Sequence, residues 1–522
     1  MSENSFDTLV RWLSRSTTYP HAPENVEVQE THISVVFLAG QFVYKLKRPV
    51  KYDFLDFSTV DKRKQACHEE VRLNRRLAPD TYLDIVSVSR DSEGAFQLNG
   101  KESPIDWLVQ MRRLPIEQTM DQMLSRGELR LEHVSRLARV LSEFYRNLPA
   151  LELTIAEYRD RYIAHVRGNL NELLTVSHHC PAEAIHRIHG FQLQLLLLRP
   201  ELFDQRVQAG RIIEGHGDLR PEHICFTDPL TIFDCIEFSF EFRRIDIADE
   251  LSFLATECDF MGAPWIGQQL FQMMEASIEG GTSVLIDFYK SYRACVRAKI
   301  NALRADQLSG NQRDATAAAA ARHLELADSY VQPWLHPLII VVGGLSGTGK
   351  STLARKMSES LGCQLIQTDE IRQQMYGKTE LPADFDRGKY SLLARQRVYA
   401  ELIRRARALL RSGVSVVLDG TFSSAEALRQ TRQIASDNRS HFFAIECTCD
   451  PNIARQRIAR RLAVETDFSE MRPELHDQQS MTWELWPQDG CHICIDTEQP
   501  IDVQLQLALG KLTGIISTET PS

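Results

Sequence analysis

The sequence predicts two modules of different fold class, an α+β module followed by an α/β module built on a parallel sheet. Two observations predict this division. An Ala-rich helical stretch, ATAAAAARHLELADSYV, ends just before Pro333, and the apolar strand-like run LIIVV begins at Leu338. Beyond Leu338, further apolar runs alternate with helical patterns, as in a parallel sheet. The length of 522 residues also favours several structural units over one core.

Composition and charge limit the classes of function. The chain is 43% apolar and 25% charged, as in ordinary globular proteins. Its 60 basic and 70 acidic residues give a net charge of −10, which disfavours attachment to nucleic acid or to an acidic membrane through a general positive field. No apolar run is long enough to span a bilayer or to act as a secretory signal, so we expect a cytoplasmic protein without a membrane partner. The pattern does not specify an oligomeric state.

Cysteine and histidine pairs are interpreted as structural. The 11 cysteines are odd in number and irregularly spaced, which favours reduced thiols over a disulfide framework. Cys447-x-Cys449 and Cys491-x-x-Cys494 lie in apolar, strand-like segments, whereas structural zinc ligands usually lie on turns. His178 and His179 are interpreted as exposed histidines rather than metal ligands, because no acidic ligand pair lies near them in the sequence.

The strongest motif opens the second module. Gly344-Leu-Ser-Gly-Thr-Gly-Lys350-Ser351 satisfies the GxxxxGK[ST] pattern of a P-loop, or Walker A motif, between a strand-like run and a helical pattern. Glycines let backbone N–H groups surround a phosphate, and the following helix presents its positive end. We expect Lys350 to reach the β- and γ-phosphates of ATP and Ser351 to offer its hydroxyl to Mg²⁺. The expected nucleotide-binding residues are Gly344, Ser346, Gly347, Thr348, Gly349, Lys350, Ser351 and Thr352.

Two further strand-like runs of this module end in carboxylates. The run from Cys363 to Ile366 leads into Asp369 and then Arg372, and the run from Val414 to Leu418 leads into Asp419. Ligands of open parallel sheets bind beyond the carboxyl ends of the strands, so we expect these residues to meet the P-loop. Asp419 is a candidate for the Mg²⁺ shell or for capping the next turn. Asp369 and Arg372 have the simpler alternative of a helix N-cap and a surface arginine.

This series resembles small P-loop kinases of the polynucleotide kinase, zeta-toxin and gluconate kinase type. The resemblance implies that Asp369 orients or deprotonates an acceptor hydroxyl and that Arg372 holds the acceptor or its phosphate. In such kinases an arginine-bearing lid follows the fourth strand. The corresponding stretch here contains Arg455, Arg457, Arg460 and Arg461, of which Arg457 and Arg461 share a helix face and are the expected nucleotide contacts. This cluster lacks interleaved aromatic residues, so nucleic acid is an unlikely acceptor.

The first module contains four elements in a definite order. A strand-like run, Phe42 to Lys47, includes Lys45, and a helical pattern with two adjacent glutamates follows it. HGDLRPEH then begins at His216, and TIFD ends at Asp234. This order resembles kinases of the aminoglycoside phosphotransferase and choline kinase group, whose catalytic loop reads HGDxxxxN.

The resemblance implies a bilobal, protein-kinase-like fold with lobes at residues 1–115 and 116–333. The segment Trp107 to Pro115 would join the lobes, and Arg244 to Asp249 would brace the catalytic loop. The implied site residues are Lys45 for the α- and β-phosphates, Glu70 or Glu69 to position that lysine, Asp218 as catalytic base and Asp234 as a metal ligand.

Two departures from that group concern metal and nucleotide binding. His223 stands where the group has a second metal-binding Asn, and a neutral imidazole is a poor ligand for Mg²⁺. No GxGxxG loop precedes Lys45, and only Gly40 is available there. One interpretation is that metal use is altered, with Mn²⁺ as a possible ion and His223 as a candidate ligand. The other is that this module has lost catalysis.

The whole chain resembles bacterial two-module proteins in which an aminoglycoside phosphotransferase-like domain precedes a P-loop domain described as AAA-family or zeta-toxin-like. We therefore expect an ATP-dependent phosphotransferase whose P-loop module, residues 337–512, phosphorylates a hydroxyl of a small molecule; residues 513–522 would form a polar tail. Two alternatives remain. One is an ATP-driven switch with a catalytically degenerate kinase-like sensor, and the other is a 5′-hydroxyl polynucleotide kinase.

Overall fold

The computed structural model describes residues 3–52, 55–377, 388–462, 479–487 and 490–519. They divide into two compact units. The first unit comprises Met1–Thr154 and Gln205–Arg293, and the second comprises Ile155–Asp204 and Ala294–Ser522. The junction predicted near Pro333 therefore falls inside the second unit.

The first unit contains a six-stranded antiparallel sheet with the strand order β1-β2-β3-β8-β6-β7. Helix α1 (Glu3–Leu13) covers one face and α2 (Val60–Asn74) the other. Strand β3 shows the alternation that makes this possible, because Tyr44 and Leu46 belong to the core under α1, whereas Val43 belongs to the core under α2. Lys45 therefore faces α2. The strands are β1 (Val26–Glu30), β2 (Ser34–Ala39), β3 (Phe42–Lys47), β6 (Tyr82–Arg90), β7 (Phe96–Leu98) and β8 (Asp106–Arg112), with a small hairpin of β4 (Lys51–Tyr52) and β5 (Leu55–Asp56).

The rest of the first unit is mainly helical, with short strands around the HGD segment. Strand β9 pairs with β12, and β10 pairs with β11. Residues 215–223 form the loop between β9 and β10, so the HGD sequence lies at the ends of both small sheets. The elements are α3 (Met120–Ser125), α4 (Leu131–Asn147), β9 (Ile212–Glu214), β10 (Ile224–Cys225), β11 (Thr231–Ile232), α8 (Phe240–Arg243), β12 (Arg244–Asp246), α9 (Ile247–Phe260) and α10 (Pro264–Met273).

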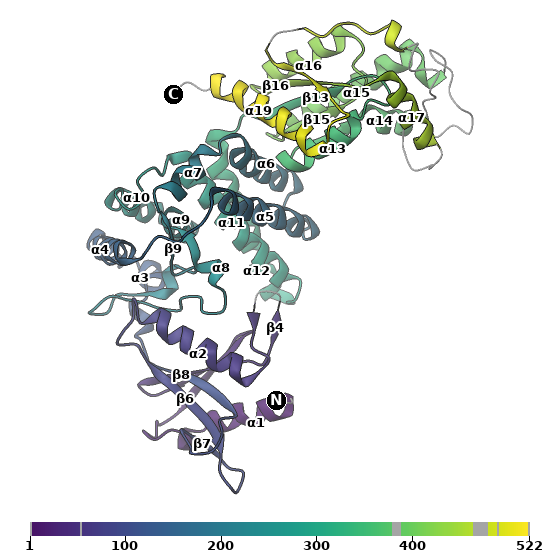
Figure 1. Cartoon of the computed structure of the whole chain (residues 1–522). Helices are drawn as coiled ribbons and strands as arrows, with labels where there is room; N and C mark the ends of the chain where they lie inside the picture. The colour runs from purple at the N-terminus through teal and green to yellow at the C-terminus, as the bar shows by residue number, and fades with distance from the viewer. Residues whose placement is uncertain (1–2, 53–54, 378–387, 463–478, 488–489, 520–522) are drawn as a thin grey trace. The chain divides into compact units, whose positions relative to one another are not determined.

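The second unit contains a five-stranded parallel sheet with the order β14-β15-β13-β16-β17, as predicted for this module (Figure 1). Strand β13 is buried on both faces. Ile340 and Val342 pack against α13 and α19, and Ile339 and Val341 pack against α15 and α16. The elements are β13 (Leu338–Gly343), α13 (Lys350–Leu361), β14 (Gln364–Gln367), α14 (Thr368–Tyr376), α15 (Leu392–Arg411), β15 (Val416–Asp419), α16 (Ala425–Asp437), β16 (His441–Thr448), α17 (Pro451–Leu462), β17 (His492–Asp496) and α19 (Ile501–Glu519).

A layer of helices that precedes the sheet in sequence belongs to the same unit. Gly190 of α6 lies against the turn at Gly362, where an added Cβ would be 3.0 Å from the Cα of Gly190. Leu198 of α6 is part of the core formed by β13 and α13. The helices are α5 (Ile155–Thr175), α6 (Ala182–Leu198), α7 (Glu201–Gln208), α11 (Ser283–Ala305) and α12 (Gly310–Val331), with α7 and α11 each shared between the two units.

The end of the chain differs from the polar tail predicted from residue 513, because α19 continues to Glu519. Ala508, Leu512 and Ile515 are all buried in the core beneath the sheet. Their i, i+4, i+7 spacing places them on one helix face, so the last turns are held by apolar packing. Among the described residues, no helix has the length and hydropathy needed to cross a membrane.

Candidate functional site

The P-loop connects β13 to α13, and its shape requires glycine. Gly344, Gly347 and Gly349 have φ values of 142°, 83° and 84°. A Cβ on Gly344 would lie 2.5 Å from the carbonyl oxygen of Cys447, and one on Gly347 would lie 2.5 Å from that of Ala454. Both backbone conformation and close packing therefore exclude a side chain, and the loop forms the backbone cradle that a phosphate needs.

Thr497 supports this loop from the end of β17. Its hydroxyl donates to the carbonyl oxygen of Thr348 at 2.5 Å. The Arg457 guanidinium donates to the Thr497 hydroxyl at 3.1 Å and to its carbonyl at 2.9 Å. Arg457 thus lies beside the P-loop, whereas the side chain of Arg461 falls outside the described residues. Sequence reasoning missed Thr497, although it follows a strand of the same parallel sheet, as Asp369 and Asp419 do.

Gln479 was also missed. The backbone N–H of Ser346 donates to Oε1 of Gln479 at 3.1 Å. Nearby, the indole of Trp486 donates to the carbonyl of Phe422 at 3.0 Å and packs over Gly343, where a Cβ would lie 2.4 Å from the ring. Because Gln479 lies far from any motif in sequence, no local pattern pointed to it.

Asp419, at the end of β15, lies in the neighbourhood of Lys350 and Ser351. Burial raises the pKa of Asp419 above its usual range, and the charge of Lys350 partly offsets this effect. Gln367 donates to its Oδ2 at 2.8 Å. Oδ1 is buried and has no hydrogen-bond partner in the described structure. A buried carboxylate oxygen and a neighbouring serine hydroxyl are hard oxygen donors, so these residues fit Mg²⁺.

Asp369 and Arg372 form an ion pair in α14, which begins directly after β14. The guanidinium of Arg372 also stacks over the ring of Tyr390, with 4.7 Å between the guanidinium carbon and the ring centroid. Asp369 is half-buried and lies in the first helical turn, where the helix dipole favours a negative charge. Burial raises the pKa of Asp419, and the negative charge of Asp369 raises it further. The two predicted acidic positions therefore belong to one site.

In the first unit, Lys45 pairs with Glu70 at 2.8 Å and with Asp234 at 3.0 Å. Glu69 instead faces Arg72. Burial alone would raise the pKa of Asp234, but the charge of Lys45 lowers it below the usual range. The structure thus brings three of the predicted site residues into one ion-pair network.

A second lysine completes this network. Lys47, two residues along β3, pairs with Glu70 at 2.6 Å and with Glu237. It is fully buried, as is Glu70. Strand alternation alone does not distinguish Lys47 from Lys45, because both lie on the same strand face.

The HGD loop is fixed by Glu250. Its Oε1 accepts from the backbone N–H groups of His216 and Gly217 at 2.6 and 2.7 Å, and its Oε2 accepts from Tyr145 at 2.9 Å. Glu250 lies one residue beyond the segment Arg244 to Asp249 that was expected to brace the loop. Within that segment, Asp246 caps α9 and pairs with Arg206 instead.

Asp218 and Asp234 lie on either side of His223. The Nδ1 of His223 donates to the carbonyl oxygen of Asp218 at 2.8 Å, and its Nε2 accepts from the guanidinium of Arg220 at 3.3 Å. This Nε2 lies 3.6 Å from Oδ2 of Asp234. The imidazole nitrogen, and the Lys45 ammonium already on Asp234, fit Mg²⁺ poorly. Before Lys45, where the sequence lacks the Gly-rich loop of the resembled kinases, the chain forms a tight hairpin in which Ala39 pairs with Phe42 around Gly40.

Comparison with known proteins places both modules in context. Residues 339–485 match the family model AAA_33, described as an AAA domain. The uncharacterized proteins Rv2004c of Mycobacterium tuberculosis and Mb2027c of Mycobacterium bovis are each 34% identical over 452 residues, covering 85% of this chain and 87% of the relative. The chain belongs to the family of these mycobacterial proteins. The match extends beyond the AAA domain, so this family shares most of both modules, and its C-terminal part is a P-loop domain.

More distant matches include named kinases. A cytidylate kinase of Methanothermobacter thermautotrophicus is 32% identical over 89 residues, 17% of this chain and 53% of that protein. A gluconokinase structure from Sinorhizobium meliloti gives a TM-score of 0.28 at 19% identity and covers 36% of this chain and 99% of the gluconokinase. A choline/ethanolamine kinase family protein from Mesorhizobium loti gives a TM-score of 0.36 at 13% identity and covers 62% of this chain and 99% of that protein.

Proposed function

We propose that the P-loop domain binds ATP and transfers its γ-phosphoryl group to a hydroxyl of a small molecule. The observation that carries this proposal is the parallel register of the sheet, which sets Asp419 beside Val342 in the strand that leads into the P-loop and beside Gln367, two residues before Asp369. A nucleotide-binding lysine, a metal-binding carboxylate and a second carboxylate at one sheet edge are the parts that phosphoryl transfer needs.

The roles of the residues follow from their positions. The P-loop N–H groups and Lys350 hold the phosphates in line. Mg²⁺, held by Ser351 and Asp419, would neutralise phosphate charge when bound. The acceptor oxygen forms a bond to the γ-phosphorus, the bond from that phosphorus to the bridging oxygen of ADP breaks, and Asp369 accepts the hydroxyl proton.

Arg372 would act as the substrate contact. Its guanidinium is held by the carboxylate of Asp369 and by the ring of Tyr390, so it is oriented before a substrate arrives. The planar guanidinium of Arg372 has five N–H donors. It can therefore bind an anionic or polyhydroxyl acceptor and keep its contact with Asp369. Arg457, anchored on Thr497 beside the P-loop, would stabilise the charge of the transferring group.

For the first unit, we propose a kinase-like nucleotide-binding module with altered metal use. Lys45 joins Glu70 and Asp234, and Asp218 lies at the loop held by Glu250. His223 beside Asp234 favours a sensor that binds nucleotide without efficient Mg²⁺-dependent turnover. In that case the chain couples a P-loop enzyme or switch to a catalytically degenerate partner module.

The test uses the full chain, because a cut at residue 333 would divide the second unit. ATP consumption and acceptor phosphorylation are measured with a panel of sugars, polyols and nucleosides, with Mg²⁺ and with Mn²⁺. Lys350→Ala should abolish turnover by the P-loop domain, and Asp369→Asn should keep ATP binding but lose acceptor phosphorylation by at least a hundredfold. Glu370→Gln, on the neighbouring half-buried carboxylate that accepts a hydrogen bond from Gln374, is the matched control and should behave as the unmodified chain.

The outcomes separate the candidate functions. Acceptor phosphorylation that survives in Asp369→Asn would contradict the role of this residue. ATP-dependent change in the fluorescence of Trp486, with hydrolysis but no phosphorylated acceptor in any arm, would favour the switch. Turnover that persists in Lys350→Ala and disappears with Asp218→Ala would assign it to the first unit.

A further inference from the structure

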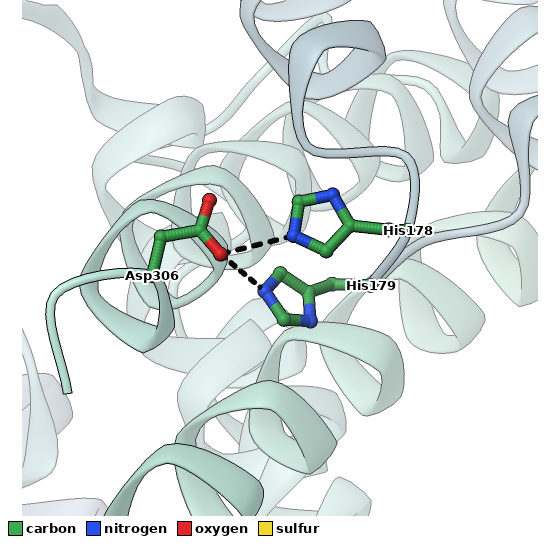
Figure 2. Close-up of side chains that lie close together, drawn as sticks. All are labelled: His178, His179 and Asp306. Atoms are coloured by element: carbon green, nitrogen blue, oxygen red, sulfur yellow. Dashed lines mark hydrogen bonds and ion pairs between the residues drawn. The ribbon is translucent and has the colours of Figure 1, made fainter. Parts of the chain in front are cut away.

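Two adjacent histidines and one aspartate come together on the helical layer of the second unit. His178 and His179 lie in the turn between α5 and α6, and Asp306 directly follows α11 (Figure 2). The two segments are separated by 128 residues in the sequence. Within the described residues, these three side chains form a group whose ligating atoms all lie within 4.8 Å of one another.

Both segments are held in place by buried neighbours. In the turn, Val176 and Cys180 are 3% and 1% exposed, and the N–H of His179 donates to the carbonyl of Val176 at 3.0 Å. On the other side, Ala305 is fully buried next to Asp306. The backbone positions of the three polar residues are therefore fixed by the packing of the turn and of the helix end.

The three side chains converge on one point. The Nε2 atoms of His178 and His179 lie 2.9 and 2.8 Å from the same carboxylate oxygen, Oδ1 of Asp306. The rings are 4.1 Å apart between centroids and tilted by 46°, so their nitrogens approach that oxygen from different directions. The side chain of His179 is 6% exposed, whereas those of His178 and Asp306 are 53% and 41% exposed. One ligand is thus rigid, and two can adjust.

We propose that His178, His179 and Asp306 bind one divalent transition-metal ion, with Zn²⁺ as the preferred occupant. Two imidazole nitrogens and one carboxylate oxygen suit borderline ions such as Zn²⁺, Co²⁺ and Ni²⁺, and they disfavour Mg²⁺ and Ca²⁺, which require oxygen ligands. Three protein ligands leave at least one coordination position for water. Cys180 is buried and does not belong to the group of ligating atoms that come together here.

Binding needs only a small rearrangement. Each imidazole moves its proton from Nε2 to Nδ1, so that the Nε2 lone pair faces the ion. With metal–ligand distances of about 2.0–2.2 Å, the ligand atoms of a tetrahedral site are about 3.3 Å apart. The present separations of 2.8 and 2.9 Å must therefore grow by roughly half an ångström. The exposed side chains of His178 and Asp306 can supply this movement without shifting the backbone.

The bound ion would crosslink the α5–α6 turn to the end of α11. An ion that binds the folded chain and not the unfolded one stabilises it in proportion to the logarithm of its concentration over its dissociation constant. The helical layer also carries the contact of Gly190 with Gly362 against the P-loop domain. The site therefore stabilises the layer on which the P-loop domain packs, and it does not depend on the proposed phosphotransfer.

The test measures metal binding by the tag-free, full-length chain in excess Mg²⁺, which occupies the oxygen-rich sites. Co²⁺ is titrated and its visible d–d absorption is followed, and Zn²⁺ is then added to displace it. One Co²⁺ per chain with a tetrahedral or five-coordinate spectrum is expected, displaced by one equivalent of Zn²⁺. Asp306→Asn and His178→Ala should each weaken Co²⁺ binding by at least tenfold. His32→Ala, which removes an exposed histidine of the first unit, is the matched control and should bind as the unmodified chain.

A variant that gains a spectroscopic signal distinguishes the loss of a metal ligand from a general disturbance of folding. Asp306→Cys places a thiolate at the carboxylate position, and it should add a sulfur-to-Co²⁺ charge-transfer band that disappears when His178→Ala is combined with it. Zn²⁺ should also raise the melting temperature of the unmodified chain but not that of Asp306→Asn. The proposal is overturned if Asp306→Asn and His178→Ala retain the affinity of the unmodified chain, or if no saturable Co²⁺ binding occurs. In either case the cluster is a set of hydrogen bonds only.

Discussion

The backbone N–H of Ser346 in the P-loop donates a hydrogen bond to the side-chain oxygen of Gln479 at 3.1 Å. Phosphate oxygens bind to P-loop N–H groups in the same way, so the amide oxygen of Gln479 and the phosphates of ATP compete for this donor. Gln479 thereby connects the segment after the arginine-bearing helix to the nucleotide site, although the two are 133 residues apart.

Gln479→Ala should tighten ATP binding, because the phosphate no longer has to displace the amide. A hydrogen bond of this kind contributes about 0.5–1.5 kcal/mol, so the dissociation constant should fall by roughly two- to tenfold. Isothermal titration calorimetry with a non-hydrolysable ATP analogue measures the change. Gln479→Glu is the opposite control, since its carboxylate repels the phosphates and should weaken binding. Equal affinities in both variants and the unmodified chain would show that Gln479 does not compete.

A second prediction concerns the contact between α6 and the P-loop domain. Gly362 has a φ of 65°, and its Cβ would lie 3.0 Å from the Cα of Gly190. Gly362→Ala combines left-handed strain of about 1–2 kcal/mol with overpacking of about 1–3 kcal/mol, so we expect a loss of roughly 2–5 kcal/mol in the free energy of unfolding. Urea denaturation measures it.

The control for this variant is Gly510→Ala. Gly510 lies in α19 of the same unit, with open space around its Cβ position, and alanine there should add up to about 1 kcal/mol through helix propensity. If Gly362→Ala is as stable as the unmodified chain, α6 does not pack tightly on the P-loop domain.

Strands and motifs of the P-loop domain could be predicted because their signals are local. The strand expected at Leu338 to Val342 is β13, the HGD residues and the P-loop glycines lie on loops, and Lys350 and Ser351 begin the expected helix, α13. Local sequence also placed Asp369 and Asp419 at the ends of two strands, and the structure shows that these strands, β14 and β15, pair directly. Periodicity and turn chemistry are short-range properties, and they are sufficient for such elements.

Residues joined by long-range contacts could not be predicted in the same way. The boundary at residue 333 follows a real change of pattern, yet α6, far earlier in the chain, contributes Leu198 to the core of the sheet. Asp306 reaches the two histidines from 128 residues away, so the histidine pair alone gave no indication of a metal site. Glu250, Gln479 and Thr497 likewise act through tertiary packing, which leaves no trace in local spacing.

The buried His189 of α6 predicts how stability depends on pH. Burial lowers its pKa from 6.5 to about 4, with smaller lowering contributions from the charges of His186 and Lys299, while its hydrogen bond to the carbonyl of Ile185 acts in the opposite direction. Between these two pKa values the unfolded chain binds a proton that the folded chain does not. The free energy of unfolding should therefore decrease as pH falls from 6.5 towards 4, by up to about 1.4 kcal/mol per pH unit for this group.

His189→Gln should reduce the slope of the free energy of unfolding against pH by the contribution of about one proton. Urea denaturation from pH 7 to pH 4.5 measures this slope. His216, whose pKa is lowered in the same way by burial to about 4, continues to titrate in that variant and leaves a residual slope. The control is His32→Ala, which removes an exposed histidine. An unchanged slope in His189→Gln would mean that this histidine is protonated in the folded chain.

His223 should determine which metal ion supports nucleotide binding in the first unit. Its Nε2 lies 3.6 Å from Oδ2 of Asp234, and its Nδ1 donates to the carbonyl of Asp218. Nitrogen ligation suits Mn²⁺ better than Mg²⁺, whereas the amide oxygen of asparagine suits Mg²⁺. In a Lys350→Ala background, which removes the P-loop contribution, we expect nucleotide binding to be stronger with Mn²⁺ than with Mg²⁺. His223→Asn in that background should shift the ratio of the two affinities at least tenfold towards Mg²⁺. An unchanged ratio would show that His223 does not coordinate the metal ion and is a packing residue of the HGD loop.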